Sequence, residues 1–405
     1  MICLVNHRSM RFVLLIVLVC SVQAFAQSGK NEQTVALKFE TRTPIDGSKN
    51  WDWWQARTAF VPGEVPLLIT TMSETGRTGT HNFHDIYQSI SRDDGRTWSK
   101  AALIPSLKRT LQADGYEVAP GDLWPTWHAK TEKLLVTGKT FNFENGKKEN
   151  RLREKVSYAV MDPASGIWGP IRFLSLPEKD HSGKPIVAVN AGCTQRVDLP
   201  NGDILLPVRY WRDAKKHNYT SIVARCSFDG ESLTYKEHGT EHSIPTGRGL
   251  YEPSLATFRG KYYLTMRADH SAFVTRGNDG LNFEPIREWS FDDGKPLDSY
   301  NTQQHWVTIG DGLFLVYTRK GADNDHIMRH RAPLFIGQVN PETLQIIRST
   351  ERILIPENHA TLGNSGVCRV SDTESWITCG EGLLRLGKRK EQTNKVLFVR
   401  ITAGG

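Results

Sequence analysis

The segment Ser91-Arg92-Asp93-Asp94-Gly95-Arg96-Thr97-Trp98 has the pattern of a tight turn between two strands. Alternating residues at positions 85–91 predict the strand that leads into it. Asp93 can accept hydrogen bonds from turn amides, Gly95 can take a positive φ, and Trp98 can pack back over the turn. A single turn of this kind does not define a fold, so the rest of the chain must be tested for repetition.

The 405-residue chain has no long segments of helical periodicity and repeats one pattern instead. Each unit has an opening strand, a turn with Gly or Asp, a strongly apolar strand, a loop and two further strands. The apolar second strands are expected at residues 67–71, 134–138, 204–208, 262–266, 313–317 and 376–379. Their first residues lie 67, 70, 58, 51 and 63 positions apart, a loose period that suits four-stranded blades with variable loops.

Six such units predict an all-β fold: one six-bladed β-propeller of four-stranded antiparallel blades over residues 34–403. The last unit lacks an outer strand after residues 395–401, and residues 34–39 are a strand candidate that can pair there and close the ring. Closure removes sheet edges that would otherwise be exposed. A β-sandwich is the competing architecture, but it would not explain six similar units.

The N-terminus has the composition of an export signal, predicted over residues 1–26. Arg8 and Arg11 precede the apolar run at residues 12–22, and small residues allow cleavage after Ala26. The run is too short to span a bilayer. We therefore expect a secreted or periplasmic protein with no membrane contact after cleavage, and a retained anchor is the alternative.

The formal net charge is +7, and the basic residues are scattered along the chain. This distribution argues against nucleic-acid binding and suits an acidic glycan as partner. Four cysteines follow the predicted signal: Cys193, Cys226, Cys368 and Cys379. Cys368 and Cys379 flank an expected hairpin turn, so they either form a disulfide or stay as buried thiols. No spacing resembles a metal site, and no cofactor is expected.

The turn at residues 91–98 has the spacing Ser-x-Asp-x-Gly-x-Thr-Trp, with degenerate copies at 226–233 and 276–283. Further segments with characteristic patterns lie at residues 122–135, 191–207 and 252–267. Together these features resemble the sialidase (neuraminidase) superfamily. The segment at residues 91–98 matches every consensus position of the Asp box, a turn motif of that superfamily. The resemblance covers nearly the whole chain after the signal and implies a sialidase-like propeller.

The resemblance also implies three arginines, from different blades, that hold a substrate carboxylate. Guanidinium groups bind both carboxylate oxygens in one plane and stay charged at any working pH. Matched by position, these are Arg57, Arg267 and Arg331, with Arg329 as a competitor for the third place. Tyr251 is a further substrate-binding candidate. A surface or inter-blade salt bridge is the alternative role for each arginine.

For catalysis, the resemblance implies a tyrosine on the last blade that is activated by a glutamate, here Glu252. Asn364 stands where that tyrosine is expected, and an amide cannot attack a sugar. The family's acid/base aspartate lies in the loop before the first Asp-box strand. In this chain that region offers His81, His84 and Asp85 as acid/base candidates.

Three functions are therefore weighed. The first is a secreted, sialidase-like exo-glycoside hydrolase that acts on a terminal acidic sugar, either sialic or uronic acid, of a glycan. The second is a uronate-directed lyase or dehydratase with a histidine or tyrosine base, for which His81, His84 and His128 are candidates. The third is a glycan-binding propeller without catalysis. Because a carboxylate pair across the sugar is typical of hydrolysis, the hydrolase is the expectation to test.

Overall fold

The computed structural model describes residues 33–47, 51–76, 83–146, 148–382 and 394–404. The predicted signal and His81 lie outside these residues. Residues Thr34–Gly405 form one compact unit. Its described part consists of strands and four single-turn 3-10 helices: η1 (Pro105–Leu107), η2 (Arg151–Arg153), η3 (Met328–His330) and η4 (Arg348–Thr350). Among the described residues we find no helix with the length and apolar composition needed to cross a bilayer.

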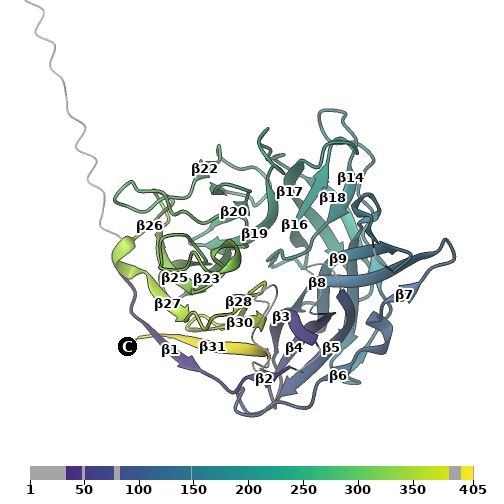
Figure 1. The fold of residues 1–405 in the computed structure, drawn as a ribbon, viewed down its shortest axis with the longest axis horizontal. Helices are drawn as coiled ribbons and strands as arrows, with labels where there is room; N and C mark the ends of the chain where they lie inside the picture. The colour runs from purple at the N-terminus through teal and green to yellow at the C-terminus, as the bar shows by residue number, and fades with distance from the viewer. Residues whose placement is uncertain (1–32, 48–50, 77–82, 147, 383–393, 405) are drawn as a thin grey trace, which may run out of the picture. The chain divides into compact units, whose positions relative to one another are not determined.

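Six antiparallel sheets, here called blades 1 to 6 in chain order, surround a common axis in this unit (Figure 1). Blade 1 contains β3 (Trp51–Val61), β4 (Leu67–Gly76), β5 (Phe83–Ser91) and β6 (Ala102–Leu103). Blade 2 contains β7 (Thr110–Leu111), β8 (Tyr116–His128), β9 (Lys133–Glu144), β10 (Lys148–Glu149), β11 (Val156–Asp162), β12 (Ile167–Trp168) and β13 (Arg172–Phe173). Blade 3 contains β14 (Val187–Asn190), β15 (Val197–Asp198), β16 (Ile204–Trp211), β17 (Tyr219–Phe228) and β18 (Leu233–His238).

The second half of the chain completes the ring. Blade 4 contains β19 (Tyr251–Phe258), β20 (Lys261–Arg267), β21 (Ala272–Gly277) and β22 (Arg287–Glu288). Blade 5 contains β23 (His305–Ile309), β24 (Gly312–Tyr317), β25 (Leu334–Asn340), β26 (Gln345–Ile346) and β27 (Arg352–Ile355). Blade 6 contains β28 (Thr361–Leu362), β29 (Gly366–Ser371), β30 (Glu374–Gly382), β31 (Lys395–Ala403), β1 (Leu37–Thr41) and β2 (Ile45–Asp46).

The predicted all-β, six-bladed propeller is confirmed. The six predicted apolar segments are the second strands of the six blades: β4, β9, β16, β20, β24 and β30. Their side chains are buried on both faces because each blade packs between two neighbours, which explains their continuous apolar pattern.

The ring closes between the two ends of the unit. β1 pairs antiparallel with β31, with Leu37 opposite Ala403 and Thr41 opposite Val399. Figure 1 shows this pair, purple beside yellow, at the outer side of blade 6. The closing strand predicted at residues 34–39 therefore exists, shifted to Leu37–Thr41. Pairing across the ends removes two open sheet edges and ties the first blade to the last.

The turn after β5 is organised by Asp93. Its carboxylate accepts hydrogen bonds from the Thr97 amide at 2.9 Å and the Thr97 hydroxyl at 2.6 Å, and these bonds lower its pKa to about 2. Gly95 has a φ of +69° and donates to Ser91 Oγ at 2.8 Å. Trp98 stacks on Phe398 of β31, with ring centroids 4.5 Å apart. The turn therefore fastens blade 1 to blade 6.

The four cysteines of the described chain are buried free thiols. Cys368 lies opposite Trp376 in the β29–β30 pair, so it does not face Cys379 across the ladder. Cys379 Sγ instead donates to the Gly363 carbonyl at 3.0 Å. Of the two alternatives left open by the sequence, the structure has the buried thiols.

Gly95 gives a test of the blade 1–blade 6 contact. A Cβ added to Gly95 would lie 2.4 Å from the ring of Trp376, which is fully buried. We expect Gly95→Ala to lower the free energy of unfolding by about 2–5 kcal/mol, from left-handed backbone strain and overpacking together. Gly115→Ala is the matched control, because Gly115 has a φ of +82° and no atom within 4 Å of the added Cβ. Denaturant unfolding should show a smaller loss for the control, about 1–2 kcal/mol, and equal losses would contradict the packing argument.

Candidate active site

The inner strands of the blades share one local distortion. β3, β8, β14 and β19 each have a register shift where the strand meets its neighbour, and one residue there has a left-handed backbone. These residues are Gln55, Asp122, Ala188 and Glu252, with φ between 49° and 54°. A bulge of this kind redirects a side chain that a regular strand would point into the sheet. Because none of the four is glycine, the structure holds strained backbone at one level of the ring.

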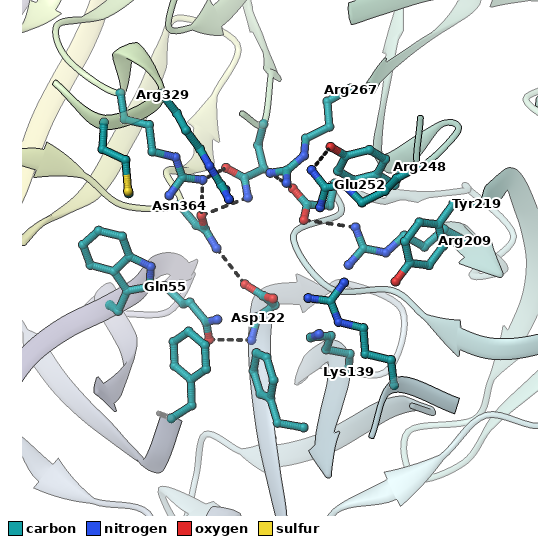
Figure 2. Close-up of a pocket in the computed structure, with 18 residues that line it drawn as sticks. Gln55, Asp122, Lys139, Arg209, Tyr219, Arg248, Glu252, Arg267, Arg329 and Asn364 are labelled. Atoms are coloured by element: carbon teal, nitrogen blue, oxygen red, sulfur yellow. Dashed lines mark hydrogen bonds and ion pairs between the residues drawn. The ribbon is translucent and has the colours of Figure 1, made fainter. Parts of the chain in front are cut away.

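Three of these bulge residues line a pocket to which all six blades contribute (Figure 2). The lining residues are Trp54, Gln55, Phe83, Asp122, Lys139, Phe141, Arg151, Arg209, Tyr219, Arg248, Tyr251, Glu252, Arg267, Gln303, Met328, Arg329, Arg331 and Asn364. Counted together with the open solvent at its mouth, the pocket has a volume of about 830 Å³.

Glu252 lies between two arginines on one side of the pocket. Its Oε1 is 3.0 Å from Arg209 Nη1, and its Oε2 forms an ion pair with Arg267 Nη1. All three residues are at most 7% exposed. Burial alone would raise the pKa of Glu252, but Arg267 and Arg209 lower it to about 2. Glu252 is therefore ionised at neutral pH, and its charge balances one of the two guanidinium groups.

Asp122 lies at the centre of the pocket in Figure 2, and Asn364 points toward it. Asp122 Oδ1 accepts hydrogen bonds from Asn364 Nδ2 and from Cys193 Sγ, each at 2.8 Å. Its backbone amide donates to Gln55 Oε1 at 2.6 Å. Burial and the nearby Asp122 and Glu252 raise the pKa of Cys193, so its thiol stays protonated and continues to donate. Asp122 is thus fixed by two donors to its carboxylate, Asn364 and Cys193, and by one acceptor of its backbone amide, Gln55.

The Asn364 amide also connects Asp122 to an arginine. Asn364 Oδ1 accepts hydrogen bonds from Arg331 Nη2 at 3.1 Å and from Gln303 Nε2 at 2.9 Å. Arg331 is 7% exposed and has no carboxylate partner within the described residues. Burial, and then the charges of Arg267 and Arg329, lower the pKa of Arg331 to about 10. This guanidinium group is still charged at neutral pH and lacks a counterion.

Other cations of the pocket have acids behind them. Lys139 Nζ lies 2.9 Å from Glu154 Oε1, and Arg151 Nε lies 3.4 Å from Glu149. Arg248 donates through Nε to Asp269 Oδ1 at 2.8 Å. The charges of Lys139, Arg151 and Arg248 are therefore compensated by neighbouring acids, unlike the charge of Arg331 among the described residues.

Aromatic side chains form the remaining wall. Phe83 and Phe141 stack with ring centroids 4.4 Å apart, and they share a buried cluster with Trp54. Tyr219 lies beside Arg209 in Figure 2, with the guanidinium group of Arg209 4.9 Å from its ring centroid. Burial and the nearby Glu154 raise the pKa of Tyr219. Within the described chain, its hydroxyl has no hydrogen-bond partner, so it is available to a ligand.

The structure brings four of the predicted site residues into this pocket: Tyr251, Glu252, Arg267 and Arg331. Tyr251 supports the arginines, because its ring lies under Arg267 at 4.5 Å and its hydroxyl accepts from Arg248 at 2.6 Å. Glu252, predicted as catalytic, has both oxygens engaged by guanidinium groups. Its observed contacts are those of a carboxylate that holds the arginines in place.

Arg57 does not line the pocket, contrary to the predicted placement. It is fully buried, donates to the Leu123 carbonyl at 3.3 Å and lies 5.0 Å from the Trp124 ring. A Cβ on Gly366 would approach its side chain within 2.6 Å. Arg57 is therefore fully buried among its neighbours and is not part of the pocket lining.

The predicted acid/base residues also need correction. Asp85 and His84 belong to β5 and are absent from the pocket lining, while their neighbour Phe83 is part of it. Asp85 Oδ1 accepts from the backbone amide of Arg109 at 2.9 Å, which gives it a structural role in blade 1. His81 lies outside the described residues. His128 bonds Thr131 Oγ1 and the Gly202 carbonyl, so it joins blades 2 and 3.

Several residues of the pocket were not predicted as functional: Asp122, Lys139, Arg151, Arg209, Tyr219 and Arg248. Asp122 is in a segment that resembles a sialidase blade, but in a regular strand its side chain could face either side. Only the bulge between Gly121 and Trp124 directs it into the pocket. A left-handed aspartate has no reliable sequence signal, although Asp and Asn tolerate this backbone better than most residues.

Two clusters outside the pocket bring together side chains that can ligate metals. One consists of His181, His238 and Glu241, and the other of His326, Glu357 and His359. In the first, Arg212 already forms an ion pair with Glu241. In the second, His326 and His359 are both exposed. Neither cluster contributes a residue to the pocket lining.

Several solved structures share this fold at low sequence identity. A protein of unknown function from Dyadobacter fermentans is 11% identical, with a TM-score of 0.65, and the match covers 91% of this chain and 99% of that one. A Trypanosoma rangeli sialidase in complex with sialic acid is 14% identical, with a TM-score of 0.59, over 91% of this chain and 59% of that one. The Hadza microbial sialidase Hz136 is 14% identical, with a TM-score of 0.59, over 87% and 66%.

These likenesses define the fold class: the chain is a sialidase-like six-bladed β-propeller. It spans only 53–60% of the length of the trypanosomal sialidases that it matches. No protein-family model and no curated protein matches the sequence. At these identities the comparisons establish the fold, and any activity has to be argued from the pocket itself.

The ion pairs of Glu252 with Arg209 and Arg267 predict that the stability of the fold depends on pH. Because the folded pKa of Glu252 is about 2, below the ordinary value near 4.5, its ionised form stabilises the fold above pH 4.5, and this contribution is lost as the pH falls toward 2. Glu252→Gln should lower the free energy of unfolding at pH 7 by about 3–5 kcal/mol, because it leaves Arg209 and Arg267 buried without a counterion.

The difference between wild type and Glu252→Gln should then shrink by about 3 kcal/mol between pH 4.5 and pH 2. Chemical denaturation across this pH range measures it. Glu231→Gln is the control, because Glu231 pairs with Arg172 at the surface and its side chain is 75% exposed. A constant difference for Glu252→Gln across the range would show that the pKa of Glu252 is not lowered in the folded protein.

Proposed function

We propose that the protein is an exo-acting glycoside hydrolase that removes a terminal acidic sugar from a glycan. The observation that carries the proposal is the arrangement of one pocket: buried guanidinium groups without full compensation on one side, aromatic rings on another, and the fixed carboxylate of Asp122 between them. An acidic sugar has a group for each of these three surfaces.

Arg331 and Arg267 are the groups proposed to hold the sugar's carboxylate. Arg331 has no acid partner within the described residues, and Arg267 shares Glu252 with Arg209. A bound carboxylate supplies the missing negative charge and accepts parallel hydrogen bonds from guanidinium forks. Because these arginines are buried, the interaction is less weakened by solvent and salt than one at the surface.

The rings of Trp54, Phe83 and Phe141 offer an apolar surface for one face of the sugar ring. The floor of the pocket is closed by the Asp122–Asn364–Gln303 hydrogen bonds. A pocket with a closed floor accommodates the terminal sugar of a glycan better than an internal sugar, which favours an exo-acting enzyme. In this arrangement the terminal sugar enters with its carboxylate toward Arg331, and the rest of the glycan leaves through the mouth.

Asp122 is proposed as the carboxylate that acts at the anomeric carbon. In a retaining reaction its oxygen forms a bond to this carbon while the bond to the leaving oxygen breaks, and the Tyr219 hydroxyl donates a proton to the leaving oxygen. Water then attacks the same carbon, returns a proton to Tyr219 and releases Asp122. Asn364, which stands where the family's tyrosine is expected, is a positioning residue that orients Asp122 through its amide hydrogen bond.

The alternative with a specific observation behind it is elimination from a uronic acid. There, the arginines would neutralise the carboxylate, and Tyr219, a phenol near Arg209 without a hydrogen-bond partner among the described residues, would exchange the proton next to it. The two reactions leave different products, so a single assay separates them. We also propose export from the cytoplasm, on the composition of residues 1–26.

Activity on a panel of sialosides and uronic-acid oligosaccharides tests the proposal, with released sugar and unsaturated-uronate absorbance measured together. We expect hydrolysis of a terminal acidic sugar, and a fall in kcat/KM of about 10–100-fold in Arg331→Gln, since a charged hydrogen bond contributes about 1.5–3 kcal/mol. The exposed Arg352 of β27 is the control as Arg352→Gln. Unsaturated product without hydrolysis would favour the lyase, and no turnover of any substrate would contradict both reactions.

A second experiment tests the role of Asp122. We expect Asp122→Ala to reduce kcat by at least about 1,000-fold, because it removes the group that forms the covalent bond. If Asp122 is the nucleophile, azide should restore turnover in the alanine variant and yield a glycosyl azide of inverted configuration. Asp114→Ala, at an exposed ion pair with Arg153, is the control. Full activity of Asp122→Ala would remove Asp122 from the mechanism.

A further inference from the structure

The positive charge of the pocket exceeds what one carboxylate can compensate. Four guanidinium groups line the same side, those of Arg209, Arg267, Arg329 and Arg331, whereas the carboxylates that line the pocket are Glu252 and Asp122. A sugar with one carboxylate would leave one excess positive charge among these groups. Uncompensated charges held close together are costly in a partly desolvated site.

Arg329 is the cation that the proposed carboxylate site leaves unexplained. It lies at the rim of the pocket and is exposed, whereas Arg331 is buried at the floor. Burial of part of its side chain, and then the charges of Arg267 and Arg248, lower the pKa of Arg329. No described residue accepts a hydrogen bond from its guanidinium group or forms an ion pair with it. Arg329 therefore faces other cations without an acid of its own.

The backbone holds Arg329 in this position at a cost. Arg329 and His330 are consecutive left-handed residues, with φ of 57° and 51°, and each such residue costs on the order of 1–3 kcal/mol. The conformation is maintained by His330, whose ring bonds Tyr300 at 2.7 Å and Asp325 at 3.0 Å. Asn324 also ties the loop to the Ala332 carbonyl at 2.7 Å. Backbone strain that is supported in this way is typical of groups positioned for a ligand.

We infer that the substrate carries a second acidic group, and that Arg329 is the specificity-determining residue that binds it. The inference rests on the proposed function, since it places the sugar's carboxylate at the deep Arg331 and Arg267. The second group lies nearer the mouth, because Arg329 is exposed whereas Arg331 is buried. A guanidinium fork binds the oxygens of a sulfate or phosphate ester in pairs. The substrate class is therefore an acidic sugar that also bears such an ester.

Calorimetric binding of matched sugars tests this inference on the full-length protein. The probes are glucuronic acid, glucuronic acid 2-sulfate, glucuronic acid 1-phosphate and sialic acid. We expect at least one ester to bind about tenfold or more tightly than glucuronic acid, which corresponds to about 1.4 kcal/mol. Tighter binding of the sulfate alone or of the phosphate alone identifies the ester, and tighter binding of both supports a site for either.

The decisive quantity is the ratio of ester to plain-sugar affinity in two variants. Arg329→Gln should bring this ratio close to one, while Arg331→Gln should weaken every acidic sugar and leave the ratio above one. Arg287→Gln, at an exposed arginine of β22, is the control for a general loss of surface charge. A further variant, Arg329→Lys, keeps the positive charge but not the forked guanidinium group, and it should retain part of the preference for the ester.

The outcomes separate this inference from the proposed function. If both esters bind no more tightly than glucuronic acid, or if Arg329→Gln keeps the preference, the inference is overturned while carboxylate recognition stands. If none of the four probes binds, both the proposed function and this inference are contradicted. A preference for an ester that is lost only in Arg329→Gln supports the inference.

Discussion

The left-handed bulge that recurs in the inner strands is the constraint on which the pocket depends. In a regular strand, successive side chains alternate between the two faces of the sheet, and in a propeller blade both faces pack against neighbouring blades. A bulge interrupts this alternation and directs one side chain along the axis of the ring. Gln55, Asp122 and Glu252 all reach the pocket in this way. The cost of three strained residues is met by the cores of the blades around them.

The cationic side chains around these residues are of two kinds, those paired with an acid and those without an acid partner among the described residues. Lys139, Arg151 and Arg248 are paired with acids behind the pocket wall, so they stiffen the wall and contribute little net charge. Arg331 and Arg329 have no such partners among the described residues, and burial, followed by the charge of Arg267, lowers the pKa of both. In the proposed function, the paired cations shape the site and the unpaired ones bind the anionic group of the ligand.

The sequence was sufficient to predict the blade count, the second strands and the ring closure, because these depend on local periodicity and on turn residues. Four residues that it predicted for the site, Arg267, Arg331, Tyr251 and Glu252, line the pocket, and their positions follow the order of the blades. It misplaced Arg57 and Asp85, because whether an inner-strand side chain reaches the axis depends on neighbouring blades. Asp122 was missed for a related reason, since its direction is set by a bulge that no residue pattern marks.

Asn364 of blade 6, which stands where the resemblance implies a tyrosine, and Asp122 of blade 2 have positions with one physical explanation in the proposed reaction. An amide can donate and accept at once, so Asn364 binds the carboxylate of Asp122 through Nδ2 and the guanidinium group of Arg331 through Oδ1. A phenol at the same place has one proton and would compete with Asp122 for the sugar. In the proposed reaction the nucleophile therefore moves across the ring from blade 6 to blade 2. In the same proposal, Arg331 and Arg267 bind the carboxylate from the blades that the resemblance implies, and only the reacting group differs.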